Sequence, residues 1–235
     1  MNTLQYFLRR IFVSIIVFFG VSIVIFCLAR LIPGDPARIA LGPFATDEMV
    51  EQLRETLHLN ESIFIQYGIF IEKLFQGDLG ISTYTKRPVL VDIVSYFPAT
   101  FELVLMSGLL MILIGMPLGI LSGKFKNSII DNVARLISLL GVVTPSFLWA
   151  IILMLIFAFW FPILPVSERM NEALDPPTLV TGLLLVDSLL EGNFKVFGDA
   201  FLHLILPGLA IALPAIGNVA RLTRTNLSDV YEKQY

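Results

Sequence analysis

Few side chains in this sequence could carry out acid–base, nucleophilic or metal chemistry together. The two histidines, His58 and His203, lie far apart in the chain. The single cysteine, Cys27, excludes an internal disulfide and a CxxC metal site, and its apolar neighbours favour the role of a small buried hydrophobe. No carboxylate lies deep in an apolar stretch, so neither an acid pair nor a Ser/His pair is expected there. The sequence therefore predicts no catalytic site, no metal site and no cofactor, and it indicates that the chain is not an enzyme.

One glycine-rich stretch, residues 119–124 (GILSGK), superficially resembles a phosphate-binding loop. Its spacing is wrong for that motif, and Phe125 stands where a Ser or Thr would be needed. The stretch also ends an apolar segment, whereas a phosphate loop opens a helix after a strand. Nucleotide binding by this chain is therefore not expected.

The elements that hold these residues are those of a membrane protein. The chain is 56% hydrophobic and 15% charged, whereas a soluble domain is about 45–50% apolar and about 25% charged. An apolar stretch of 19 residues is about 28 Å long as a helix, which is close to the thickness of the hydrocarbon core, about 30 Å. A segment that crosses the lipid is expected to be helical, because its backbone polar groups must form hydrogen bonds with one another. Four stretches fit, at residues 11–29, 101–121, 136–161 and 201–219. The first is longer than a signal-peptide core and lacks an A-x-A site, so an uncleaved anchor is expected.

The distribution of Lys and Arg predicts the orientation. The segments 1–10, 122–135 and 220–235 together carry a net charge of +5, whereas the long segments 30–98 and 162–200, counted together with Glu102, carry −8. The positive-inside rule then places the short segments and both termini in the cytoplasm and the two long segments outside.

The first outer segment is patterned as a small helical cap. Thr46 followed by two acids predicts a helix start, and Ser62 predicts a second start, with Gly77 placed to end that helix. Pro88 suits the first turn of a third short helix that would lead to Pro98. In the second outer segment, the apolar residues 180–190 are too few to span a bilayer. They are expected to lie at the membrane interface or to pack on the cap.

Small residues and prolines mark positions where helices approach or bend. Gly115, Gly119 and Gly123 are spaced by four, which favours a close helix–helix contact; a gating contact is the alternative. Glu102 lies within about one turn of the outer end of its stretch, where it could line an outer vestibule or have an interfacial role. Prolines interrupt three of the stretches and predict kinks. These prolines are Pro117, Pro145, Pro207 and Pro214.

Several blocks, in order along nearly the whole chain, resemble the membrane permeases of dipeptide/oligopeptide (and nickel) ABC importers. They are residues 8–10 (LRR), 31–37 (LIPGDPA), 66–67 (QY), 77–82 (GDLGIS), 98–100 (PAT), 114–119 (IGMPLG), 144–147 (TPSF), 204–207 (LILP) and 220–224 (ARLTR). The resemblance implies an all-α integral membrane protein of the ABC importer type I permease class, with four transmembrane helices present of an expected six. Two further spans, preceded by an Arg/Ala-rich block ending in Gly, would follow residue 235.

The resemblance also implies partners and a mechanism. The partners would be a second homologous permease, two cytoplasmic ABC ATPases and an extracytoplasmic substrate-binding protein, in a cell (inner, cytoplasmic) membrane. Motion of the ATPases would reach the permease through a cytoplasmic coupling segment, and Glu102, Pro145 and Ser146 are candidates for the path or gate. The residues at the start of the coupling segment would be Arg221, Arg224, Asn226, Leu227, Asp229, Val230 and Tyr235.

Two functions remain open at this point. The first is a permease subunit for peptides or a similar small solute, for which dipeptides, longer peptides, nickel chelates and sugars are all compatible with the resemblance. The alternative is a non-transporting membrane scaffold or sensor that binds a ligand with its outer cap. Arg221 and Arg224 fit both, since cations at a cytoplasmic helix end could serve only as topological anchors.

Overall fold

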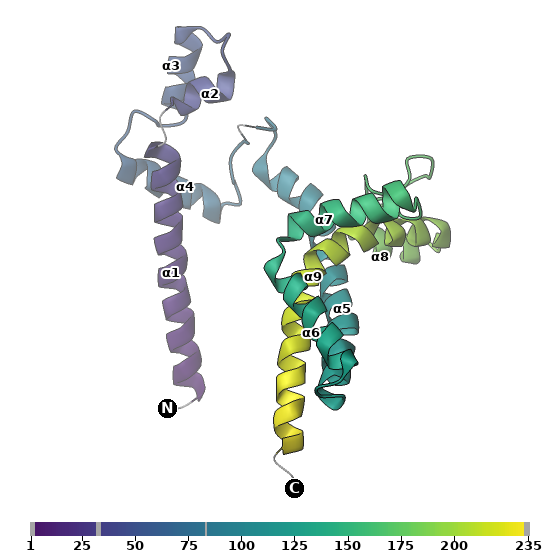
Figure 1. Ribbon diagram of the computed structural model, residues 1–235. Coiled ribbons are helices and arrows are strands. Elements are labelled where there is room, and N and C mark those ends of the chain that lie inside the picture. Colours follow the sequence, from purple (N-terminus) through teal and green to yellow (C-terminus); the bar gives the residue numbers. More distant parts are fainter. Residues whose placement is uncertain (1–2, 32–33, 83, 233–235) are drawn as a thin grey trace. The chain divides into compact units, whose positions relative to one another are not determined.

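The computed structural model describes residues 3–31, 34–82 and 84–232 (Figure 1). Within these ranges the regular structure is helical, apart from an isolated antiparallel bridge between Ile81 and Pro88. In chain order the helices are α1 (Thr3–Leu31), α2 (Pro36–Leu41), α3 (Asp47–Thr56), α4 (Ile63–Phe75), α5 (Val89–Lys124), α6 (Ile129–Val143), α7 (Ser146–Met154), the π-helix η1 (Leu155–Trp160), α8 (Leu184–Leu190) and α9 (Phe194–Glu232).

Three of the described helices, α1, α5 and α9, are long and apolar enough to cross a membrane. A fourth span is present if α6 and the helices that follow it are counted as one bent element. The expected all-α membrane fold is thus confirmed. The expected stretches 11–29, 101–121 and 201–219 each lie inside a longer helix.

The prediction of a separate short helix between Pro88 and Pro98 was wrong. α5 begins at Val89 and runs through Pro98 and Pro117 to Lys124 without a break. A proline inside a helix removes one amide donor, but its fixed φ is compatible with the helical backbone, so the helix can continue past it. The helix that begins at Val89 is therefore the same helix that contains the second apolar stretch.

The third apolar stretch, expected as one tilted span over residues 136–161, is divided. α6 ends at Val143 and α7 begins at Ser146, and the two helices are bent by 111° at the break. The cause is Pro145, whose ring disfavours helical backbone in Thr144, which is extended with ψ 125°. A proline expected to kink a helix instead separates two helices.

The chain divides into two compact units, Met1–Ile93 and Val94–Tyr235. In the first unit, the predicted helix starts at Thr46 and Ser62 are confirmed by α3 and α4. Asp35 caps α2 by accepting from the Ala37 amide at 3.0 Å, and it pairs with Arg54 of α3 at 2.7 Å. Partial burial opposes ionisation of Asp35, but the Arg54 guanidinium and the Ala37 amide hold the pKa of that carboxyl below its ordinary value.

In the second unit, α9 is the helix against which α6, α7 and α8 pack. Small residues let two of these helices approach closely. A Cβ on Gly141 of α6 would lie 2.7 Å from the Leu213 carbonyl oxygen, and a Cβ on Gly217 of α9 would overlap the Ser138 carbonyl oxygen. Two buried clusters complete the packing of α9. One joins Leu153 to Leu206 and Ala210, and the other joins Leu184 to Val196 and Ala200.

Candidate functional site

A buried carboxylate joins the ends of three helices in the second unit. Asp131, in the first turn of α6, is fully buried. It accepts hydrogen bonds from Ser122 Oγ of α5 at 2.6 Å and from the Asn127 amide at 2.9 Å. Arg224 of α9 donates to both carboxylate oxygens, from Nε at 2.7 Å and from a terminal nitrogen at 3.0 Å. Arg135 adds an ion pair at 3.1 Å.

The donors around Asp131 explain how the charge is tolerated inside the protein. Removing a carboxylate from water costs several kcal/mol unless its oxygens are paired and hydrogen-bonded. Here the pairing with Arg224 is bidentate, the geometry in which an arginine–carboxylate contact is strongest and most specific. We call these residues (Asp131, Ser122, Asn127, Arg135 and Arg224) the Asp131 clamp. It holds the end of α9 against α5 and α6.

The sequence did not single out Asp131. Ser128 and Asp131 are recognisable as a helix start, and Ser128 Oγ indeed accepts from the Asp131 amide at 3.3 Å. That local signal predicts a capped helix. It carries no information on Arg224, which lies 93 positions further along the chain.

The two arginines predicted at the start of the coupling segment have different environments. Arg224 is half-buried and faces Asp131, whereas Arg221 is exposed and donates to Asn218 Oδ1 on its own helix at 2.9 Å. Both border a groove of about 460 Å³ between α6 and α9, together with Arg135. The end of α9 therefore has one arginine used in packing and one open to its surroundings.

The other residues of the predicted coupling segment lie in the last turns of α9. Asn226, Asp229 and Val230 are exposed, and Leu227 is half-buried against α5. Tyr235 lies outside the described residues. Asp229 and Val230 lie three and four positions after Asn226, so both lie on the same side of the helix as Asn226.

The three glycines spaced by four lie along the contact of α5 with α9. A Cβ on Gly115 would lie 3.1 Å from Val219 Cβ, and one on Gly123 would lie 3.0 Å from a Leu227 methyl group. Gly119 has the least room, since a Cβ there would lie 2.5 Å from Thr223 Cβ and 2.6 Å from the Ala220 carbonyl oxygen.

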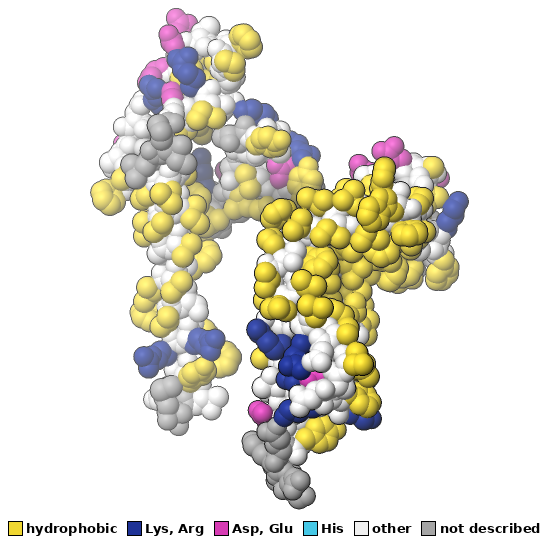
Figure 2. All heavy atoms as spheres, viewed as in Figure 1, with side chains coloured by type: hydrophobic (Ala, Val, Ile, Leu, Met, Phe, Trp, Pro, Cys, Tyr) yellow, Lys and Arg dark blue, Asp and Glu magenta, His cyan; other side chains and the backbone are white. Residues whose placement is uncertain are grey.

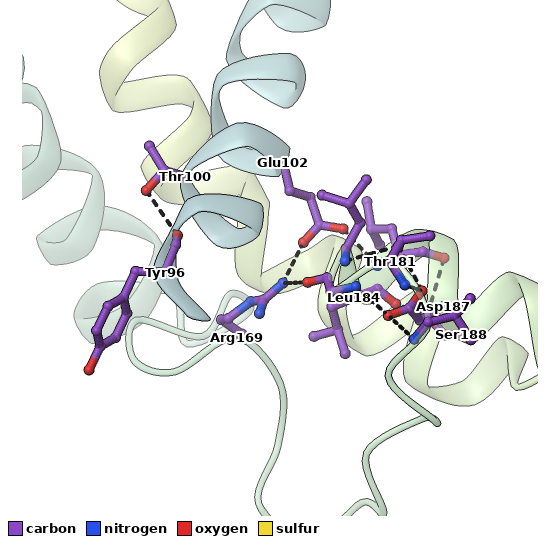
Figure 3. A network of polar contacts seen from close by, with 12 residues as sticks. Tyr96, Thr100, Glu102, Arg169, Thr181, Leu184, Asp187 and Ser188 are labelled. Carbon is purple, nitrogen blue, oxygen red and sulfur yellow. Dashed lines mark hydrogen bonds and ion pairs between the residues drawn. The ribbon is translucent and has the colours of Figure 1, made fainter. Parts of the chain in front are cut away.

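A second polar cluster surrounds Glu102 in the N-terminal half of α5 (Figure 3). Glu102 is buried, and its two oxygens accept from different parts of the chain. One accepts from Arg169 at 3.0 Å and the other from the Leu185 amide of α8 at 2.7 Å. Arg169 also donates to the Gly182 carbonyl oxygen at 3.2 Å. We call residues 161–183 the connector. Glu102 thus holds both the connector and α8 against α5.

The turn that enters α8 is built on a second buried acid, Asp187. Its carboxylate accepts from the amides of Val180, Thr181 and Gly182 and from the Thr181 hydroxyl, at 2.7 to 3.3 Å. Burial works against ionisation, but these donors hold the pKa of Asp187 below its ordinary value. The segment 180–190 that was expected at the interface or on the cap therefore begins with an ordered turn. Within the second unit it packs against α9.

The two remaining candidates for a path or gate, Pro145 and Ser146, lie at the break between α6 and α7. Both side chains are exposed. Neither is part of the Asp131 clamp, and the donors to Glu102 described above are Arg169 and the Leu185 amide. Over the described ranges 3–31, 34–82 and 84–232, no three His, Cys, Asp or Glu side chains are arranged to hold a metal ion.

Comparison with known proteins identifies the class. Residues 3–104 match the family model described as the N-terminal part of binding-protein-dependent transport system membrane components, and residues 115–235 match the model of binding-protein-dependent transport system inner membrane components. The chain belongs to this family. It is an integral membrane permease subunit of the ABC importer type, and it is not an enzyme, because ATP hydrolysis in this family lies in separate subunits.

Similar relatives cover nearly the whole chain. The probable D,D-dipeptide transport system permease protein DdpB of Escherichia coli (strain K12) is 41% identical over 97% of this chain and 67% of its own length. The dipeptide transport system permease protein DppB of Alkalihalophilus pseudofirmus is 37% identical over 99% of this chain and 69% of its own length. The di/tripeptide permease DppB of Pseudomonas aeruginosa is 34% identical, with the same coverage.

Proposed function

We propose that this chain forms half of the translocation path of an ATP-driven importer for di- or oligopeptides. The observation that carries the proposal is the match to dipeptide and di/tripeptide permeases over 97% or more of the chain, at 34 to 41% identity. Family membership implies that a binding protein delivers the solute and that ATPase subunits supply the energy.

The specific arrangement is also part of the proposal. The chain would pair with a second homologous permease and two cytoplasmic ATPases, and an extracytoplasmic binding protein would dock on the other side. The membrane would be the cell (cytoplasmic) membrane, with the N-terminus in the cytoplasm. The excess of Lys and Arg in the short segments supports this orientation.

The end of α9 would receive the motion of an ATPase. The exposed face with Asn226, Asp229 and Val230 is available for such a contact. Because Asp131 binds Arg224 from the opposite side, a push on this face would be passed to α5 and α6 rather than bending the end of α9 alone. The candidates for path or gate remain Glu102, in the N-terminal half of α5, and Pro145 and Ser146, at the α6–α7 break.

The function is tested by reconstitution. The full-length subunit would be purified with its partner permease and ATPases, placed in proteoliposomes and supplied with the binding protein, ATP and a radiolabelled dipeptide. ATP-dependent uptake that disappears with a hydrolysis-deficient ATPase is expected. A subunit that co-purifies with no ATPase and no second permease would instead favour the scaffold or sensor function.

Substitutions of exposed residues on α9 test whether the end of this helix receives the motion of the ATPase. Arg221→Ala and Asp229→Ala should leave thermal stability unchanged but weaken the stimulation of ATP hydrolysis by the loaded binding protein. Phe194→Ala is the matched control, because Phe194 is 72% exposed at the opposite end of α9. Equal ATPase stimulation in all three variants would contradict the assignment.

A further inference from the structure

α4 has a largely apolar and exposed surface. Of its thirteen residues only Glu72 and Lys73 are charged. Phe64 and Phe75, near its two ends, are 84% and 80% exposed, and Ile65 is 50% exposed. Contiguous apolar surface of this kind normally marks contact with a protein or a membrane.

α4 contacts α1 well inside the apolar stretch of α1, residues 11–29. Tyr67 and Ser22 share a hydrogen bond between their hydroxyls at 2.7 Å. The Phe26 ring lies 5.3 Å from the Tyr67 ring and 5.5 Å from the Phe70 ring. A helix rises about 1.5 Å per residue, so Ser22 lies about 12 Å along the axis from Arg30, the charged residue that ends the run. At that depth α1 itself is in the hydrocarbon region, because the core is about 30 Å thick and the run from residue 11 to residue 29 just spans it.

The space between the two helices is mostly apolar, with Arg10 and Ser14 of α1 as its polar lining residues. α1 and the C-terminal half of α4 enclose an open groove of about 780 Å³. Its walls include Ile15, Phe18 and Phe19 of α1 and Ile71, Leu74 and Phe75 of α4. Figure 2 shows hydrophobic side chains along the middle of α1, with Lys and Arg gathered toward its N-terminal end. The groove therefore extends from the Ser22 contact further along the apolar part of α1.

Several polar groups of α4 are paired, which lowers the cost of leaving water, although Gln66 Oε1 is buried without a hydrogen-bond partner among the described residues. Its Tyr67 hydroxyl bonds to Ser22, and Gln66 Nε2 turns back to the Glu61 carbonyl oxygen at 2.8 Å. The C-terminal turn is closed by the Gln76 amide, which donates to the Glu72 and Lys73 carbonyl oxygens. A helix with its backbone bonded internally is the form in which a short segment can lie in the membrane boundary.

We propose that α4 lies within the lipid leaflet that contains the C-terminal half of α1, with acyl chains against its exposed apolar face and in the groove. α2 and α3 differ, since their surface carries the ion pairs of Arg38 with Asp47 and of Arg54 with Asp35. The helical cap expected over residues 30–98 would then consist of a water-exposed part, α2 and α3, and a membrane-embedded part, α4. This inference does not depend on the transported solute.

Depth measurement by spin labelling tests the proposal. The native Cys27 would be replaced by Ala, and single cysteines would be introduced by F64C, F75C and F44C in the full-length protein, reconstituted in vesicles with cysteine-free partner subunits. Phe44 is the control, because it is 98% exposed in the turn between α2 and α3. Exposed positions are chosen so that the substitutions do not disturb packing, and circular dichroism would confirm the helix content of each variant.

Labels at F64C and F75C should collide more with membrane-dissolved oxygen than with a water-soluble nickel complex, and the label at F44C should show the reverse. Preferential collision with the nickel complex at positions 64 and 75 would overturn the proposal. So would low accessibility to both reagents, because it would mean that protein, not lipid, covers α4. Peptide uptake is not part of the readout, so an unexpected solute would leave this result intact.

Discussion

Gly119→Ala probes the contact of α5 with α9 with the smallest possible change. The added methyl group would lie 2.5 Å from Thr223 Cβ and 2.6 Å from the Ala220 carbonyl oxygen. The carbonyl belongs to the backbone of α9, so a change of side-chain rotamer cannot relieve the overlap, and the helices must separate. Overpacking of this kind costs about 1–3 kcal/mol, whereas alanine in place of glycine inside a helix favours folding by about 1 kcal/mol. The net expectation is a destabilisation of up to about 2 kcal/mol.

Gly108→Ala is the matched control, because Gly108 lies in the same helix with nothing within 4 Å of its added Cβ. This variant keeps only the helix-propensity effect and should be stabilised by up to about 1 kcal/mol. Unfolding in detergent, titrated with a denaturing detergent and followed by circular dichroism, measures both. If the Gly119 variant were as stable as the Gly108 variant, α5 and α9 would not be in the contact that the structure describes.

Three further predictions concern charged residues. Asp131→Asn should lower the unfolding free energy by about 3–5 kcal/mol, because it leaves Arg224 without its buried partner. A double variant that also carries Arg224→Met should recover part of that loss. If the double variant recovered none of it, the pairing of Asp131 with Arg224 would be contradicted. Glu102→Ala should make the connector more susceptible to proteolysis, because it removes the acceptor of the half-buried Leu185 amide, at a cost of about 1–3 kcal/mol. Unchanged cleavage of the connector would argue that Glu102 does not hold it against α5. Asp35 has a lowered pKa, so its stabilisation of α2 and α3 is present above the unfolded value of about 3.9 and is lost as pH falls through the folded value. Hydrogen exchange in these helices should lose protection at acid pH in the wild type but not in Asp35→Asn, and a loss already complete near neutral pH would refute the Asp35–Arg54 linkage.

The sequence was informative where structure depends on local physics. The charge-free run of α1 and the helix-start residues Thr46 and Ser62 are short-range signals, and the helices they predict are present. Pro98 shows the limit of such signals, because a proline marks both helix starts and tolerated interior positions. Whether Pro98 starts a helix or lies inside one depends on the backbone on both sides of it, and α5 is continuous through Pro98.

The candidate site depended on distant pairing, which periodicity does not encode. Arg224 was predicted as a coupling residue, but its partner Asp131 was not, because an acid in the first turn of a helix is already explained by the helix dipole. Glu102 was placed near the end of its stretch, yet Arg169 is 67 positions away in an irregular segment. Family resemblance supplied the function, whereas the arrangement of these charges required the structure.

The break after Val143 lies next to α9, and the packing of α9 shows which part of that helix it faces. α6 lies along the part of α9 that includes Leu213, and α7 lies along the part that includes Leu206. Pro207 directly follows Leu206 and Pro214 directly follows Leu213, so each part contains one proline, and each proline leaves a preceding carbonyl without its helical donor. The prolines are seven positions apart, about two turns, so both weaken the same side of the helix. The break between α6 and α7 therefore lies beside a stretch of α9 that lacks two helical hydrogen bonds, so both neighbours have fewer backbone hydrogen bonds at the same level of this unit.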